Sequence, residues 1–133
     1  MITPKTIVTD KAPALIGPYS LARVHQGVAY LSGQLPIDPA TGALISDDVV
    51  EQTAQCLNNL NAIVEAAGAT RDQILRVTMM VTGFDRMQEV NAVYADFFRA
   101  PYPARATFQV AGLPMAARIE MDAVVALAGE RDG

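Results

Sequence analysis

Residues 118–127 read Arg118-Ile119-Glu120-Met121-Asp122-Ala123-Val124-Val125-Ala126-Leu127 and alternate with the period of a β-strand. Successive side chains of a strand point to opposite faces of the sheet. One face would carry only apolar residues, namely Ile119, Met121, Ala123, Val125 and Leu127. The other would mix acidic and apolar side chains, namely Glu120, Asp122, Val124 and Ala126. We expect this mixed face to be half covered by another subunit.

The segments before this strand predict the other elements. A helix is expected to begin near Ser46 or Asp48, either of which can cap it, and to end at Gly68. Its apolar residues recur at helical spacing. The remaining predicted elements are a hairpin (21–24 and 28–32), a strand (73–82), a second helix (86–98) and a strand (104–110).

With an opening strand, the order becomes strand, hairpin, helix, strand, helix, strand, strand, which is an α+β pattern. It predicts a single mixed β-sheet with two α-helices packed on one face, within one domain spanning residues 1–133. Helices on one side leave the other side of an apolar sheet bare. We therefore expect the protein to self-associate.

Composition narrows the class of protein. With 133 residues, of which 51% are hydrophobic, the chain can bury one core and is too apolar to be disordered. No stretch reaches the roughly 20 apolar residues that span a bilayer, and no charged-then-apolar leader opens the chain. We therefore expect a soluble, cytoplasmic protein with no membrane partner. One cysteine (Cys56, expected to be buried) and one histidine (His25) do not favour a metal site, and no cofactor is expected.

Charge argues against a nucleic-acid partner. The formal net charge is −4, and the ten Lys and Arg residues are scattered along the chain without a cluster. Proteins that bind nucleic acids usually present a basic face that neutralises phosphates. We therefore expect no nucleic-acid binding.

The strongest candidate for a binding residue is Arg105, within Pro103-Ala104-Arg105-Ala106-Thr107. A guanidinium among small and apolar residues needs a planar carboxylate partner, and the local sequence supplies none. A structural salt bridge to Glu120 or Asp122 is one possibility. The other is the carboxylate of a ligand, which we favour.

Other residues are candidates for the same site. Thr107 follows Arg105 on the same side of its strand and offers a hydroxyl. Gly33 allows close backbone approach to a ligand. Ser32 and Tyr19 are polar tips in apolar contexts, although Ser32 would equally satisfy a carbonyl at the strand end and Tyr19 would equally pack against its neighbours. Glu120 is suited to position or deprotonate a water molecule.

Several segments, in order and with the right separations, resemble the RidA (YjgF) family over nearly the whole chain. They are residues 14–20 (ALIGPYS), 30–42 (YLSGQLPIDPATG), 64–68 (VEAAG), 91–98 (NAVYADFF), 103–108 (PARATF), 111–114 (AGLP) and 119–121 (IEM).

The resemblance implies a chorismate mutase-like fold, assembled as a homotrimer with clefts between neighbouring subunits. It also implies activity as a cofactor-free 2-iminobutanoate/2-iminopropanoate deaminase. Carried over residue by residue, the carboxylate-binding arginine is Arg105, the acid that handles water is Glu120, and the pocket tyrosine and serine are Tyr19 and Ser32. Thr107 stands where many members have cysteine, a difference that bears on substrate range.

The candidate residues also limit the chemistry. No Ser-His or Cys-His pair is apparent, and no Gly-rich phosphate loop. A carboxylate anchor, hydrogen-bond donors and one acid suffice only for a substrate that is already electrophilic, such as the imine of a small 2-oxo acid. The alternatives are a non-enzymatic protein that binds 2-oxo acids in the same cleft and, ranked lower, an endoribonuclease or translation inhibitor.

Overall fold

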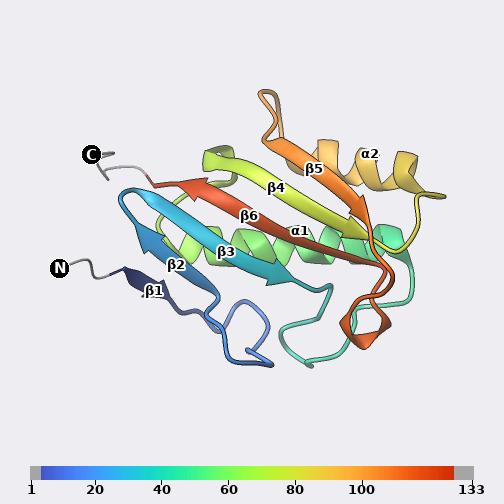
Figure 1. Cartoon of the computed structure of the whole chain (residues 1–133), viewed down its shortest axis with the longest axis horizontal. Coiled ribbons are helices and arrows are strands. Elements are labelled where there is room, and N and C mark those ends of the chain that lie inside the picture. The colour runs from blue at the N-terminus through green and yellow to red at the C-terminus, as the bar shows by residue number, and fades with distance from the viewer. Residues whose placement is uncertain (1–3, 128–133) are drawn as a thin grey trace.

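The computed structural model describes residues 4–127, which form a six-stranded mixed sheet with two α-helices on one face (Figure 1). The strand order is β1-β2-β3-β6-β4-β5, and only the β4–β5 pair within this range is parallel. The strands are β1 (Lys5–Ile7), β2 (Ala22–His25), β3 (Val28–Gln34), β4 (Ile74–Val81), β5 (Ala104–Gln109) and β6 (Ile119–Ala126). The helices are α1 (Val49–Ala66) and α2 (Met87–Phe97), with short 3-10 turns at Arg71–Gln73 and Pro114–Ala116. The predicted mixed sheet with two helices on one side is confirmed.

Local signals explain the boundaries of α1. Of the two predicted caps, Asp48 is the N-cap, and its Oδ2 accepts a hydrogen bond from the Glu51 amide at 3.0 Å. Ser46 lies two residues earlier and accepts from the Asp48 amide instead. Gly68 follows the helix with φ +82°, a conformation that glycine adopts without strain, and its amide bonds to the Glu65 carbonyl.

The core lies between the sheet and the helices. On β6, the residues from Ile119 to Val125 alternate between buried and half-buried, as the sequence predicts, and the buried ones pack with α1 and α2. Cys56 is fully buried in this core, as expected. These buried residues of β6 therefore face the helix layer.

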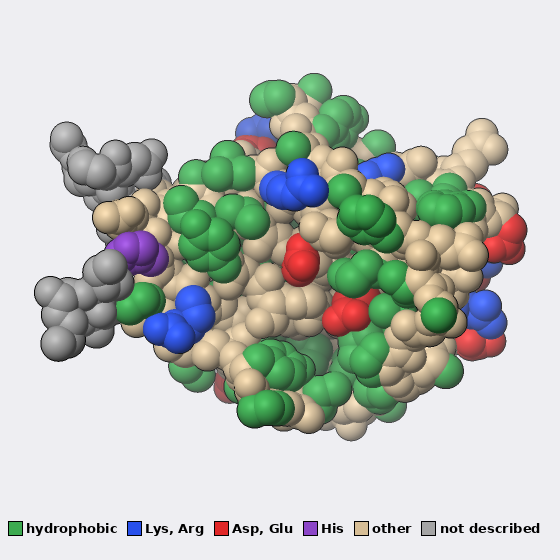
Figure 2. All heavy atoms as spheres, in the orientation of Figure 1, with side chains coloured by type: hydrophobic (Ala, Val, Ile, Leu, Met, Phe, Trp, Pro, Cys, Tyr) green, Lys and Arg blue, Asp and Glu red, His purple; other side chains and the backbone are tan. Residues whose placement is uncertain are grey.

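The opposite face of the sheet is open and partly apolar. Tyr30 of β3 and Phe108 of β5 are both 55% exposed, and their cross-strand partners Val124 and Met80 are only half-buried. Figure 2 views this face and shows hydrophobic side chains spread over the strands, with acidic side chains near the middle. Within residues 4–127, neither helix is both long enough and apolar enough to cross a membrane.

Candidate functional site

A cavity of about 380 Å³ opens beside the ends of β3 and β6. We call it the Glu120 cavity. Its lining is mostly apolar, with a few polar side chains. The lining residues are Pro13, Ala14, Leu15, Ile16, Tyr19, Leu21, Ser32, Gly33, Gln34, Leu35, Ile37, Pro114 and Glu120. Four of the predicted site residues, Tyr19, Ser32, Gly33 and Glu120, therefore lie together.

Glu120 is the acidic group of this cavity. It is half-buried, and burial raises the pKa of its carboxyl above the ordinary value of 4.5, with the negative charge of Asp122 adding to the effect. Both acids lie on the open face of β6. A carboxylate with a raised pKa is a better proton acceptor than a solvated one, which suits it to general-base chemistry.

Gly33 lies directly under the Glu120 carboxylate. A Cβ built on Gly33 would stand 2.6 Å from Glu120 Oε2, closer than real atoms approach. The absence of a side chain at residue 33 is therefore what lets the carboxylate lie against the backbone of β3. Close approach to the backbone at Gly33 was predicted from the sequence, although the approaching group was expected to be a ligand and not a side chain of the protein.

Ser32 and Tyr19 occupy the wall of the cavity in different ways. The Ser32 hydroxyl donates to the Ser20 carbonyl at 2.6 Å, which is the structural role considered above for this residue. Its oxygen lone pairs stay available to accept a hydrogen bond. Tyr19 is 43% exposed, and its ring packs against Gly17, so it forms part of the rim.

A buried amide holds the floor of the cavity in place. Asn59 of α1 is 1% exposed, and its Nδ2 donates to the carbonyls of Leu35 (3.0 Å) and Ile37 (2.9 Å). Its Oδ1 accepts from Gln55 Nε2 at 2.8 Å. These bonds tie the loop after β3 to the helix layer, and the sequence analysis did not identify them because Asn59 falls within an otherwise apolar stripe.

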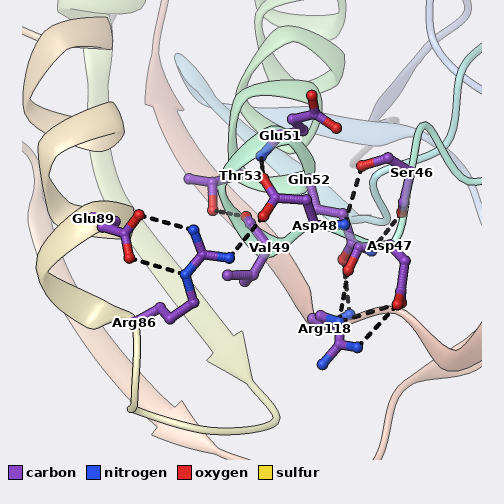
Figure 3. Close-up of polar contacts among 10 residues, drawn as sticks. All are labelled: Ser46, Asp47, Asp48, Val49, Glu51, Gln52, Thr53, Arg86, Glu89 and Arg118. Atoms are coloured by element: carbon purple, nitrogen blue, oxygen red, sulfur yellow. Dashed lines mark hydrogen bonds and ion pairs between the residues drawn. The ribbon is translucent and has the colours of Figure 1, made fainter.

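A polar network fixes the chain where β6 begins (Figure 3). The buried Gln52 of α1 accepts from the Arg118 amide at 2.8 Å and donates to the Ser46 carbonyl at 2.8 Å. The Arg118 side chain donates to the Asp47 carbonyl and carboxylate. Arg86 bridges Asp48 and Glu89, joining the first turns of α1 and α2. The network therefore anchors the residue two positions before Glu120.

Arg105 lies elsewhere, in a second cavity of about 300 Å³ between α2 and β5. We call it the Arg105 cavity, and its lining residues are Asn91, Tyr94, Ala95, Tyr102, Pro103 and Arg105. The guanidinium carbon of Arg105 stands 4.8 Å from the centre of the Tyr94 ring. Within residues 4–127, no acidic side chain pairs with Arg105, so the considered salt bridge to Glu120 or Asp122 does not form.

Strand register explains why that salt bridge is absent. Arg105 pairs with Val77, whose side chain faces the helices. Paired residues of neighbouring strands point to the same side, so Arg105 also faces the helix layer, in agreement with its contact to Tyr94. Glu120 pairs with Met80 and faces the open side. The two residues therefore point to opposite faces, with β4 between their strands.

The predicted site residues thus divide into two groups within one protomer. Thr107 pairs with Met79 and shares the Arg105 side of the sheet, but it does not line the Arg105 cavity. Tyr94, which the sequence did not connect with Arg105, is buried beside it. Among the described residues, no group of three His, Cys, Asp or Glu side chains could hold a metal ion.

Comparisons with known proteins agree with this architecture. A family model described as Endoribonuclease L-PSP matches residues 9–127. The chain is 46% identical over 127 residues to the RutC family protein y4sK of Sinorhizobium fredii, covering 96% of this chain and 99% of that protein. It is 40% identical over 120 residues to a Homo sapiens protein named 2-iminobutanoate/2-iminopropanoate deaminase, covering 90% of this chain and 88% of that protein.

A solved structure is similar across the whole fold. The crystal structure of E. coli TdcF with bound serine has a TM-score of 0.89 and 36% identity, covering 93% of this chain and 99% of that chain. This chain belongs to the endoribonuclease L-PSP family, also known as the YjgF/RidA family.

Proposed function

We propose that this protein is a hydrolytic deaminase that converts 2-iminopropanoate and 2-iminobutanoate to 2-oxo acids and ammonia. The observation that carries the proposal is the guanidinium of Arg105, with which no acidic side chain of residues 4–127 pairs and which can anchor a carboxylate, in a chain that also presents the half-buried Glu120 in a cavity. Relatives about 40% identical over most of the chain are named for this reaction. The serine bound to TdcF is likewise a small molecule with a carboxylate.

The chemistry needs few groups. Arg105 binds the substrate carboxylate through charge-assisted hydrogen bonds. Glu120 accepts a proton from water as the water oxygen bonds to C2 of the protonated imine, giving a carbinolamine. Transfer of that proton from Glu120 to nitrogen, cleavage of the C–N bond and return of the hydroxyl proton to Glu120 release ammonia and leave the 2-oxo acid. No electrons are exchanged, so these steps need no redox cofactor. Holding substrate and water together supplies much of the rate advantage.

The separation of Arg105 from the Glu120 cavity within one protomer argues that several subunits assemble to form the site. Adjacent strands are about 4.8 Å apart, so Arg105 and Glu120 are separated by roughly 10 Å across the sheet in addition to pointing away from each other. A three- or four-carbon imino acid cannot reach both within one protomer. We therefore propose a homotrimer in which the Arg105 of one subunit completes the Glu120 cavity of the next. The open, partly apolar face is the surface available for burial in such an assembly.

RNA cleavage is less compatible with this surface. Three arginines, Arg86, Arg99 and Arg118, are engaged by acidic side chains. Figure 2 shows the basic groups of the open face as separate spots. A phosphate-binding face needs clustered, unneutralised cations.

The test is ammonia release from freshly generated 2-iminopropanoate. Wild-type protein should accelerate it, and Arg105→Ala should abolish the acceleration while keeping the wild-type circular dichroism spectrum and melting temperature. Glu120→Gln separates an enzyme from a protein that only binds 2-oxo acids, because the variant should still bind 2-oxobutanoate but lose turnover. Full turnover by a folded Arg105→Ala protein would exclude the proposed function.

A further inference from the structure

Within residues 4–127, the Arg105 guanidinium lies against the aromatic ring of Tyr94, with its carbon 4.8 Å from the ring centre. This distance is within the range in which a cation is attracted to the face of a ring. A guanidinium carries its N–H donors in its own plane, and an aromatic ring can engage it without accepting from those donors. The contact therefore engages Arg105 without an acceptor atom, and no hydrogen bond within residues 4–127 occupies its N–H donors.

Two other arginines, Arg86 and Arg118, are held differently. Arg86 donates to Asp48 and Glu89 at 2.7–2.9 Å, and Arg118 donates to Asp47. Their donors are occupied by acceptors of the same chain. An acidic side chain bound to Arg105 would compete directly with the carboxylate of a ligand for the same N–H donors, whereas an aromatic ring does not.

The Tyr94 ring is itself rigidly supported. Tyr94 is 5% exposed, and its ring centre lies 4.8 Å from that of Phe98, which in turn lies 4.8 Å from that of Phe97. All three aromatics come from the C-terminal part of α2 or the residue after it. Burial raises the pKa of Tyr94, outweighing the opposing charge of Arg105, so the ring remains a neutral phenol. The Tyr94 hydroxyl is buried without a hydrogen-bond partner among the described residues, so packing holds the ring.

We propose that Tyr94 is a positioning residue that holds Arg105 by its face so that the edge of the guanidinium can receive the substrate carboxylate. This inference rests on the proposed function for the identity of the ligand. The positioning role belongs to the Tyr94 ring and not to its hydroxyl. Loss of the ring should weaken binding of any small carboxylate at Arg105, whether or not that carboxylate is turned over.

The test compares three variants by calorimetric titration with 2-oxobutanoate. Tyr94→Met removes the ring but keeps an apolar side chain of useful volume, and it should raise the Kd about tenfold, as expected for loss of a partly desolvated cation–π contact. Tyr94→Phe keeps the ring, so its Kd should stay near the wild-type value. Phe84→Met is the control, because it removes an exposed ring that lines neither the Arg105 cavity nor the Glu120 cavity. It should leave the Kd unchanged.

A measurement on folded wild-type protein complements the titrations. The Nε–Hε resonance of Arg105, assigned by its absence in Arg105→Met, should show a ring-current shift that is also present in Tyr94→Phe. Equal Kd values for wild type and Tyr94→Met would overturn the proposal, as would an equal loss in Tyr94→Phe and Tyr94→Met. So would the absence of both the ring-current shift and carboxylate binding in wild type. Carboxylate binding that depends on the ring, in a protein without imine hydrolysis, would support the positioning role while excluding the deaminase.

Discussion

Glu120 and Gly33 lie so close that any side chain at residue 33 would overlap the carboxylate, since a Cβ there would stand 2.6 Å from Glu120 Oε2. The two residues belong to the neighbouring strands β6 and β3. The position of the proposed base thus depends on a residue that contributes no functional group.

Gly33→Ala is expected to displace the carboxylate and reduce kcat about 100-fold, the cost of misplacing a catalytic group by about 1 Å. The displaced atom is the end of a flexible side chain, so the melting temperature should change little. Steady-state kinetics on 2-iminopropanoate and a thermal melt measure the two effects. Gly112→Ala is the control, because a Cβ there meets nothing within 4 Å. Wild-type kcat in Gly33→Ala would show that the position of Glu120 is not limiting.

Mixed oligomers test whether Arg105 and Glu120 act across a subunit boundary. Arg105→Ala and Glu120→Ala proteins should each be inactive alone. Refolded together at equal concentrations, they should recover about a quarter of wild-type activity, because each mixed trimer regains one intact site. Wild-type protein taken through the same refolding gives the reference. No recovery, with mixed oligomers demonstrated by mass spectrometry, would contradict a shared site.

The raised pKa of Glu120 predicts a pH dependence. The residue must be ionised to accept a proton from water, so kcat should fall as the pH decreases through a pKa above 4.5. Asp122→Asn removes a negative charge that raises this pKa, so the acid limb of the pH–rate profile should move to lower pH. Glu65→Gln, an exposed acid on α1, should leave the limb in place. Identical acid limbs for wild type and Asp122→Asn would refute the assignment of that limb to Glu120.

Asn59 should matter for stability because it satisfies two backbone carbonyls in the loop after β3. Asn59→Leu leaves both without their donor, which is expected to lower the free energy of unfolding by about 3 kcal/mol. Urea denaturation at a fixed protein concentration measures the change. The neighbouring Asn58→Leu places the same substitution at an exposed position of α1 and should have little effect. Equal stabilities of the two variants would mean that the loop finds other donors.

Much of the fold was predictable because the signals are local. The alternation of β6, the apolar stripe of α1, the Asp48 cap and the glycine at residue 68 each depend on residues a few positions apart. The ends of the hairpin strands and of the second helix lie within two residues of the predicted ends. The opening strand, for which the pattern gave no range, is Lys5–Ile7.

The polar residues buried in α1 escaped prediction for a physical reason. Gln52 and Asn59 are buried among apolar neighbours because carbonyls and an amide from distant loops pair with them. Those partners are 6 to 66 residues away along the chain. The sequence of α1 alone therefore gives no indication of these partners.

The chain on its own determined which side chains share a face within each strand, and it identified Arg105 and Glu120 as the groups with unusual surroundings. Only the tertiary structure decided that these two residues point to opposite sides of the sheet. Period-two alternation relates residues of the same strand, whereas the side that faces the helices depends on which strands pair and in what register. With β6 between β3 and β4 and with β5 parallel to β4, Glu120 lies on the open face and Arg105 lies against Tyr94.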